Sequence, residues 1–427
     1  MMLGNWRYGH PRRAGRRLLA IVIRLSFESG QEPMVLFASF WHAGFESASH
    51  RNSRGIRVDM IAATQHVEQA EEDYARLPSL DIRVAHEGIR WHLVEQGDRF
   101  DFASIVPVMD AASRHGVQVI WSLCHYGWPD DLDIFSPEFV TRFARYGAAT
   151  AEFIAHASDA IPVYAPFTEI SFLAYAAGEV GTFYPYARGR GDELKAQLVR
   201  AAIAGIEAIW RVDPRARIVH VDSVINVVPP RDRPDLAELA DRHTASQFAV
   251  WDWLVGRARP DLGGHPRYLD IVGVNFYHYS QWEYPEGRLR WEEVPRDPRW
   301  VPFHQLLAGT YARYHRPVFV AETSYDRAGK GRWICEIAAE VARARESGVP
   351  VEGICLYPII DRPDWDVPQQ WHHSGLWDLV PDRSGRLQRV LVEEYAAGLA
   401  EARSLVEVGG AEQARDDHRL LEEGVTS

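Results

Sequence analysis

Two glutamates of the chain lie in apolar surroundings, where a charged carboxylate is costly. Glu169 lies within YAPFTEISF (164–172), and Glu322 lies within PVFVAETSYD (317–326). An ionised carboxylate is expensive to remove from water unless it is paired or used in chemistry. Hydrolysis of a glycoside uses two carboxyl groups, one that protonates the leaving oxygen and one that attacks the anomeric carbon or activates water. Glu169 and Glu322 are candidates for such a pair, and the alternative is that both are structural acids.

Short apolar runs, each followed by a stretch with helical periodicity, recur along the chain. Alternation of this kind predicts parallel strands joined by helices. Eight such repeats, without a glycine-rich phosphate turn after the first run, favour an α/β fold with one domain, the (β/α)8 TIM barrel, over a doubly wound sheet. The expected strands are 34–40, 82–89, 117–124, 161–167, 217–222, 269–277, 317–323 and 351–357.

The barrel explains why two distant glutamates could work together. In this fold the catalytic residues lie at the carboxyl ends of the strands, which meet at one face of the barrel. Glu169 follows the fourth expected strand, and Glu322 lies at the end of the seventh. We therefore expect both carboxyl groups to face one pocket.

The two ends of the chain differ from its middle. Residues 1–33 carry six arginines and one short apolar run, LLAIVI. That run is too short to span a bilayer, and no small-residue cleavage site follows it. We expect a disordered basic leader or a wrongly assigned start over 1–33, the barrel over 34–400, and an acidic mobile tail over 401–427.

Composition excludes some partners and indicates a compartment. The net charge of −12 argues against a nucleic-acid surface, which would be basic, and no membrane partner is expected. The three cysteines, Cys124, Cys335 and Cys355, lie in apolar contexts without metal-binding spacing. They predict buried free thiols in a reducing compartment, the cytoplasm.

Six stretches, in chain order from about 35 to 395, resemble motifs of glycoside hydrolase family 1, the β-glucosidase type. APFTEI resembles the acid/base motif T-F-N-E-P of that family, and VFVAETS resembles its nucleophile motif I-T-E-N-G. The resemblance implies that Glu169 is the general acid/base and Glu322 the nucleophile. GLWDLVPDRSGRLQRV resembles the segment that closes the family's domain after the eighth strand.

The remaining three motifs imply a sugar-binding shell. SLCHYGWPDDL resembles T-L-x-H-W-D-x-P, whose histidine binds the glycone, and DIVGVNFYHYS resembles D-F-I-G-I-N-Y-Y-T-S, which lies beside the nucleophile. YPIIDRPDWD resembles W-S-L-L-D-N-F-E-W, which supplies an aromatic residue under the sugar and groups that hold its outer hydroxyls. The residues implied by these matches are His125, Asn275, Tyr277, Tyr357, Asp364 and Trp365.

The chain departs from the family pattern at three places. Thr168 replaces the asparagine that binds the sugar 2-hydroxyl. His86 replaces an arginine near the nucleophile, so Glu322 would lose a permanent cation and gain a higher pKa. The first strand region, FWHAGFES, lacks the family's glycone-binding glutamine, and Trp41, His42 and Glu46 are nearby substitutes.

The resemblance implies a retaining glycoside hydrolase that cleaves a β-linked glycoside, a small molecule or oligosaccharide, without a cofactor or metal. A transglycosylating or non-hydrolytic sugar-binding barrel is an alternative, which Thr168 and His86 keep open. A metal-dependent hydrolase barrel is a further alternative, although no H-x-H follows the first strand and no lysine ends the fourth. Its candidate ligands near strand ends are His42, His86, His125, His220 and Asp222.

Overall fold

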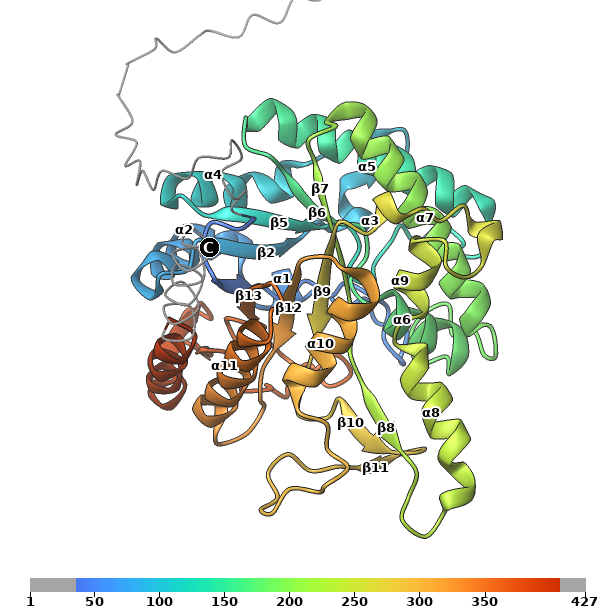
Figure 1. Ribbon diagram of the computed structural model, residues 1–427. Helices are drawn as coiled ribbons and strands as arrows, with labels where there is room; N and C mark the ends of the chain where they lie inside the picture. Colours follow the sequence, from blue (N-terminus) through green and yellow to red (C-terminus); the bar gives the residue numbers. More distant parts are fainter. Residues whose placement is uncertain (1–35, 408–427) are drawn as a thin grey trace, which may run out of the picture. The chain divides into compact units, whose positions relative to one another are not determined.

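A closed barrel of parallel strands forms the centre of the structure, a computed structural model that describes residues 36–407 (Figure 1). Each strand pairs with its neighbours along the chain, and the first strand also pairs with the last, which closes the barrel. This topology confirms the expected (β/α)8 fold. The barrel strands are β1 (Trp41–Gly44), β2 (Val84–Gly88), β5 (Gln118–Ser122), β6 (Val163–Ala165), β7 (Arg217–Ser223), β9 (Ile271–Asn275), β12 (Val318–Thr323) and β13 (Val351–Leu356).

Helices surround the barrel and cover the outer faces of its strands (Figure 1). In α5 the residues Phe139, Phe143, Tyr146 and Ile154 recur on one face and are buried, as expected for an amphipathic helix on a core. The helices are α1 (Met60–Ala63), α2 (Ala70–Arg76), α3 (Trp91–Val94), α4 (Val106–His115), α5 (Pro137–Ala157), α6 (Ile170–Leu173), α7 (Gly191–Val212), α8 (Ala237–Ser246), α9 (Ala249–Leu254), α10 (Phe303–Tyr314), α11 (Lys330–Glu346) and a last helix over 393–407.

Short strands in the connections add three small sheets outside the barrel. The first joins segments that follow β7 and β9, the second follows β13, and the third lies between β2 and β5. The second sheet is a hairpin that leads the chain from the barrel into the last helix. These strands are β8 (Asn226–Val228), β10 (Gln281–Glu283) and β11 (Gly287–Arg288), then β14 (Trp377–Pro381) and β15 (Leu387–Leu391), and finally β3 (Glu95–Gln96) and β4 (Arg99–Phe100).

The expected first strand, 34–40, was wrong. The strand is β1, Trp41–Gly44, which contains a histidine and is less apolar than the run before it. Phe37 instead packs edge-on against His42 and Phe319, with ring centroids 4.8 and 5.2 Å apart. Over the described part of this run, residues 36–40, no strand forms, and Phe37 packs against barrel side chains.

The described residues cover only part of the two ends of the chain. Residues 393–407 form one helix in which Ala402 and Val406 are buried, so the expected mobile tail, 401–427, begins inside an ordered helix. The leader expected over 1–33 lies outside the described residues, as does 408–427. Between residues 36 and 407, no helix is both long and apolar enough to cross a membrane.

A buried chain of charged groups joins the start of the barrel to the C-terminal hairpin. His66 lies between Asp73 of α2 and Glu87 of β2, with 2.9 Å from a ring nitrogen to each carboxylate. Asp73 also receives hydrogen bonds from Arg389 of β15. Burial opposes the charge on His66, but the Glu87 and Asp73 carboxylates outweigh burial and raise the pKa of His66 to about 9. His66 is therefore a cation at neutral pH.

This cation predicts how stability depends on pH. A raised folded-state pKa means that the contribution of His66 is fully present below 6.5, its ordinary pKa, and is lost as the pH rises through about 9. We expect the unfolding free energy of the wild type to fall by on the order of 3 kcal/mol more than that of His66→Gln between about pH 6 and about pH 9.5, measured with urea. His115→Gln is the control, because its partner Glu71 is half exposed. Equal pH dependence in the wild type and His66→Gln would contradict the assignment.

Candidate active site

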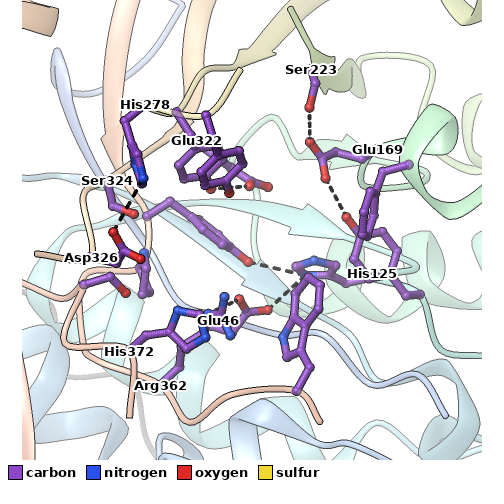
Figure 2. Close-up of a pocket in the computed structure, with 18 residues that line it drawn as sticks. Glu46, His125, Glu169, Ser223, His278, Glu322, Ser324, Asp326, Arg362 and His372 are labelled. Carbon is purple, nitrogen blue, oxygen red and sulfur yellow. Dashed lines mark hydrogen bonds and ion pairs between the residues drawn. The ribbon is translucent and has the colours of Figure 1, made fainter. Parts of the chain in front are cut away.

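A cavity of about 220 Å³ lies at the carboxyl ends of the barrel strands (Figure 2). Its walls come from the ends of β7 and β12 and from the segments that follow β1, β5, β6, β9 and β13. Glu169 and Glu322 both line it, as the sequence predicted. The two glutamates thus share one cavity.

Glu169 follows β6 in a turn with a left-handed backbone, φ 45° and ψ 66°. Two hydroxyl groups donate to its carboxylate: Ser223 Oγ to Oε1 at 2.5 Å, and Tyr126 OH to Oε2 at 2.7 Å (Figure 2). The left-handed backbone is costly for a residue other than glycine, and such strain is frequent at functional sites. The two donors fix the position of the Glu169 carboxylate.

Asp222 holds the turn that carries these groups. Its carboxylate accepts the backbone N–H groups of Ser171, at 3.1 Å, and Ser223, at 3.0 Å. Burial and the charge of Glu169 raise the pKa of Asp222 to about 7. Asp222 therefore positions both the segment after Glu169 and the serine that donates to it.

Glu322 receives fewer hydrogen bonds from hydroxyl groups than Glu169 does. It lies in β12 opposite Asn275 of β9, and Tyr277 OH donates to its Oε2 at 2.8 Å. Burial and then the charge of Glu169 raise the pKa of Glu322 well above its usual range, although the Tyr277 hydrogen bond opposes them. The amide of Asn275 is buried beside this carboxylate and makes no hydrogen bond within residues 36–407. Tyr277 is thus the clearest stabiliser of a charged Glu322.

The wall of the cavity opposite the two glutamates is built around His125 (Figure 2). Ser47 Oγ lies 2.9 Å and Tyr357 OH 3.3 Å from His125 Nδ1, and Glu46 Oε1 lies 3.8 Å from the same nitrogen. Burial lowers the pKa of His125, although the charges of Glu46 and Glu169 oppose it. Tyr357 also lines the cavity, as expected from the sequence.

Arg362 completes that wall. Its Nε lies 3.2 Å from Glu46 Oε2, and its guanidinium stacks 4.9 Å above the ring of Trp365. Trp365 lines the cavity as predicted, and Glu46 is the one residue of the FWHAGFES stretch that does so. An arginine and a glutamate therefore flank the aromatic surface on which a sugar ring could pack.

His86 and Thr168 lie deeper than expected. They line a separate space of about 30 Å³ that reaches Glu322 from inside the barrel. His86 Nε2 lies 3.2 Å from His42 Nδ1, and burial lowers the pKa of His86 to about 3, so its ring is neutral at working pH. Thr168 Oγ1 is 2.8 Å from Ser122 Oγ. Neither residue has Glu322 as its hydrogen-bond partner, and His86 supplies it with no cation.

Two expected binding residues lie away from the cavity. Trp41 alternates along β1 with His42, whose ring contacts His86 and Phe319, so the Trp41 side chain faces the outer layer. Asp364 accepts the backbone N–H groups of Asp366 and Val367 and is paired with His372 at 3.0 Å. Asp364 is therefore a turn residue in this structure.

The residues proposed for a metal-dependent hydrolase do not form a cluster. His42 and His86 are in contact, but His42, His86, His125, His220 and Asp222 include no group of three with convergent ligand atoms in the described part of the chain. His220 is buried, and burial lowers its pKa to about 4. This alternative has no support from the geometry.

Several lining residues were not predicted from the sequence. Tyr126 and Ser223 hold Glu169, while Arg362, His278 and Asp326 face the same cavity (Figure 2). Tyr126 and Arg362 lie inside two motifs from which other residues were predicted to bind the sugar. Their place in these motifs was therefore a signal in the sequence that could have identified them. Ser223 had no such signal, because the pairing of β7 beside β6 brings it to Glu169.

The chain matches no protein-family model and no curated protein. Among solved structures, it is similar to the AHE enzyme of Alicyclobacillus herbarius at 15% identity and TM-score 0.64, over 80% of this chain and 88% of that one. It is similar to the family 1 β-glucosidase of Thermotoga maritima at 14% identity and TM-score 0.63, over 80% and 87%. It is also similar to a complex of the T. maritima β-glucosidase with glucoimidazole, at 14% identity and TM-score 0.65, over 86% of this chain and 97% of that one. The resemblance indicated by the motifs is thus confirmed at the level of the fold: this chain has the (β/α)8 barrel fold of family 1 β-glucosidases.

Proposed function

We propose that this chain is a retaining glycoside hydrolase that cleaves a β-linked glycoside through a covalent glycosyl-enzyme intermediate. The observation that carries the proposal is that Glu169 and Glu322, from the fourth and seventh strand ends, line one cavity whose other walls present aromatic rings and hydroxyl groups. The T. maritima β-glucosidases of the same fold bind deoxynojirimycin and glucoimidazole, which supports a sugar-sized ligand in this cavity.

In the proposed reaction, Glu169 donates its proton to the leaving oxygen while Glu322 attacks the anomeric carbon. The hydroxyl groups of Tyr126 and Ser223 then stabilise the carboxylate that Glu169 becomes, so they act on charge that develops during the step. In the second step Glu169 removes a proton from water, which displaces Glu322 from the sugar. Tyr277 donates to Glu322 in its leaving, charged state.

The charge of Glu169 opposes ionisation of Glu322 in the shared cavity. The productive form carries a proton on Glu169 and a charge on Glu322. Burial and the charge of Glu169 raise the pKa of Glu322 well above its usual range, so acid solution protonates the nucleophile. Activity should therefore rise with pH as Glu322 ionises.

A transglycosylating or non-hydrolytic sugar-binding barrel is the second candidate. Its specific support is the environment of Glu322, which has a neutral His86 nearby where the family has an arginine. A poorly stabilised nucleophile would slow hydrolysis. Product analysis with an added acceptor alcohol separates these functions, because a transglycosylase forms the alkyl glycoside and a binding protein forms no product.

The proposed reaction needs no cofactor, and we propose that it takes place in the cytoplasm. Cys124, Cys335 and Cys355 are free thiols, which supports a reducing compartment.

The nucleophile is tested with an aryl 2-deoxy-2-fluoro glycoside, which slows the second step so that the covalent intermediate accumulates. We expect the intact protein to gain the mass of one glycosyl group, and peptide mapping to find that group on Glu322. Glu322→Ala should lose hydrolysis by about 10⁴-fold or more, with partial recovery on addition of azide. Glu352→Ala, on β13 outside both cavities, is the control. Labelling of any other residue would contradict the assignment.

The acid/base is tested by the dependence on the leaving group. Glu169→Ala should lose about 10²- to 10⁴-fold in kcat/KM on an alkyl glycoside, whose alkoxide leaves poorly without a proton. It should lose much less in the first step with a dinitrophenyl glycoside. Equal losses on the two substrates, measured under the same conditions, would exclude general acid catalysis by Glu169.

The pH profile tests the environment of Glu322. Removing the Tyr277 hydroxyl leaves the charged nucleophile without its donor, so Tyr277→Phe should raise the pKa of Glu322 further. The acid limb of kcat/KM should then move to higher pH by about one to two units. Tyr279→Phe is the control, because Tyr279 lines the cavity and its hydroxyl makes no hydrogen bond to either glutamate. An acid limb that stays in place in Tyr277→Phe would show that Glu322 does not govern it.

A further inference from the structure

A second group of titratable side chains lies outside the catalytic cavity, after the last barrel strand. Asp361 lies beyond the end of β13, His373 lies near the end of the loop that follows, and Asp378 lies in β14. His373 Nδ1 is 3.8 Å from Asp361 Oδ2 and 3.5 Å from Asp378 Oδ2, and the three ligand atoms lie within 4.8 Å of one another. None of the three residues lines the cavity that holds Glu169 and Glu322.

The carboxylate of Asp361 is the unusual member of this group. Asp361 is fully buried, with an exposed fraction of 0%. Oδ1 accepts the backbone N–H of Ser374, but Oδ2, the oxygen that faces His373, has no hydrogen-bond partner within residues 36–407. Burial, together with the charge of Asp378, raises the pKa of Asp361. A buried carboxylate oxygen without a partner is costly, and a cation would remove that cost.

Lys330, the nearest ammonium group, is already engaged elsewhere. Its Nζ donates to the carbonyl oxygens of His373, at 2.5 Å, and Gly375, at 3.3 Å. It lies 3.9 Å from Asp378 Oδ1, the oxygen that faces away from His373. Lys330 therefore shapes the backbone of the group and leaves Asp378 Oδ2 directed toward the imidazole.

We propose that Asp361, His373 and Asp378 bind a divalent transition-metal cation, such as Zn²⁺ or Mn²⁺. Metal–ligand bonds of about 2.0 to 2.2 Å in tetrahedral geometry put neighbouring ligand atoms about 3.4 Å apart. The separations from His373 Nδ1, 3.5 and 3.8 Å, are close to that value. The His373 side chain is 65% exposed, so water can reach the ion and complete its coordination.

The ligand types select the class of cation. One imidazole nitrogen with two carboxylate oxygens suits Zn²⁺, Mn²⁺, Fe²⁺ or Co²⁺, whereas Ca²⁺ and Mg²⁺ prefer oxygen ligands alone. The site has no part in the proposed glycoside chemistry. It joins the barrel end at Asp361 to β14, across the loop whose residues Arg362, Trp365 and His372 line the catalytic cavity. The bound ion would fix that loop at both of its ends.

The test uses the full-length protein after treatment with a chelator and removal of the chelator. We expect Zn²⁺ to bind with a stoichiometry near one in calorimetry, to raise the melting temperature, and to slow amide exchange across 361–378. Co²⁺ should give visible absorption from ligation by the imidazole. Mg²⁺ and Ca²⁺ should bind at least about tenfold more weakly.

A matched pair of histidine variants separates this site from other surface histidines. His373→Asn removes the imidazole from an exposed residue at φ 52°, and asparagine tolerates that left-handed backbone. His315→Asn is the control, since His315 is also exposed and has φ 50° but lies at the end of α10. His373→Asn should weaken Zn²⁺ binding by at least about tenfold, and His315→Asn should leave it unchanged.

Three results would overturn the proposal. They are absence of Zn²⁺, Mn²⁺ and Co²⁺ binding to the wild type, an equal affinity in His373→Asn, or equal binding of Mg²⁺ or Ca²⁺. Asp361→Asn gives an independent check, because it keeps the shape of the side chain and should also weaken Zn²⁺ binding. Loss of catalysis in the Glu322 variant has no bearing on these results, so the two proposals fail separately.

Discussion

A change of register in one strand places the nucleophile candidate in the cavity. Side chains alternate between the two faces of a strand, and Phe319 and Ala321 of β12 face the barrel interior. Regular alternation would turn Glu322, the next residue, outward. The pairing of β12 with β9 shifts between Val320 and Glu322, as in a β-bulge, and Glu322 also faces inward. Bulges re-aim side chains near active sites, and here one turns the carboxylate into the cavity that Glu169 also lines.

Both carboxyl groups face one buried cavity, so the charge of Glu169 opposes ionisation of Glu322. The hydrogen-bond donors around the two carboxyl groups differ in number. Glu169 is held by two hydroxyl donors, from Tyr126 and Ser223, whereas Glu322 receives one from Tyr277. Arg362 is the one arginine that lines the cavity in the described part of the chain, and its guanidinium pairs with Glu46. Among residues 36–407, Glu322 is therefore held by the Tyr277 hydroxyl and not by a cation, because Arg362 pairs with Glu46 and His86 is neutral.

The sequence predicted the order of strands and helices along the chain, but it did not predict which way individual side chains face. Seven of the eight barrel strands, and the positions of Glu169 and Glu322 after or at their ends, follow from local apolar runs and their neighbours. Whether a side chain at an aligned position faces the cavity depends on register and turns, so Trp41 and Asp364 were assigned to a site that they do not reach. His86 was expected near the nucleophile, but it lies in the middle of β2 and its ring is paired with His42 inside the barrel.

The groups that join separate segments could not be predicted, because their partners meet only in the folded chain. Ser223 reaches Glu169 from the next strand, and Glu46 meets Arg362 across more than 300 positions. The same holds for Asp361, His373 and Asp378, whose spacing matches no metal motif and whose ligand atoms converge because Trp377 of β14 pairs with Ile360, in the segment after β13.

The segment after β13 connects these separate features of the protein. Tyr357, Arg362, Trp365 and His372 line the cavity from this segment, and its two ends carry the ligands of the proposed cation site. The hairpin that follows carries Arg389, which is buried against Asp73 at the beginning of the barrel. Burial of that ion pair anchors the hairpin to the barrel, and the hairpin in turn anchors one end of the cavity wall. The buried charges around His66 and the wall opposite Glu169 and Glu322 are therefore joined by one stretch of chain, which runs from Tyr357 in that wall to Arg389 in the hairpin.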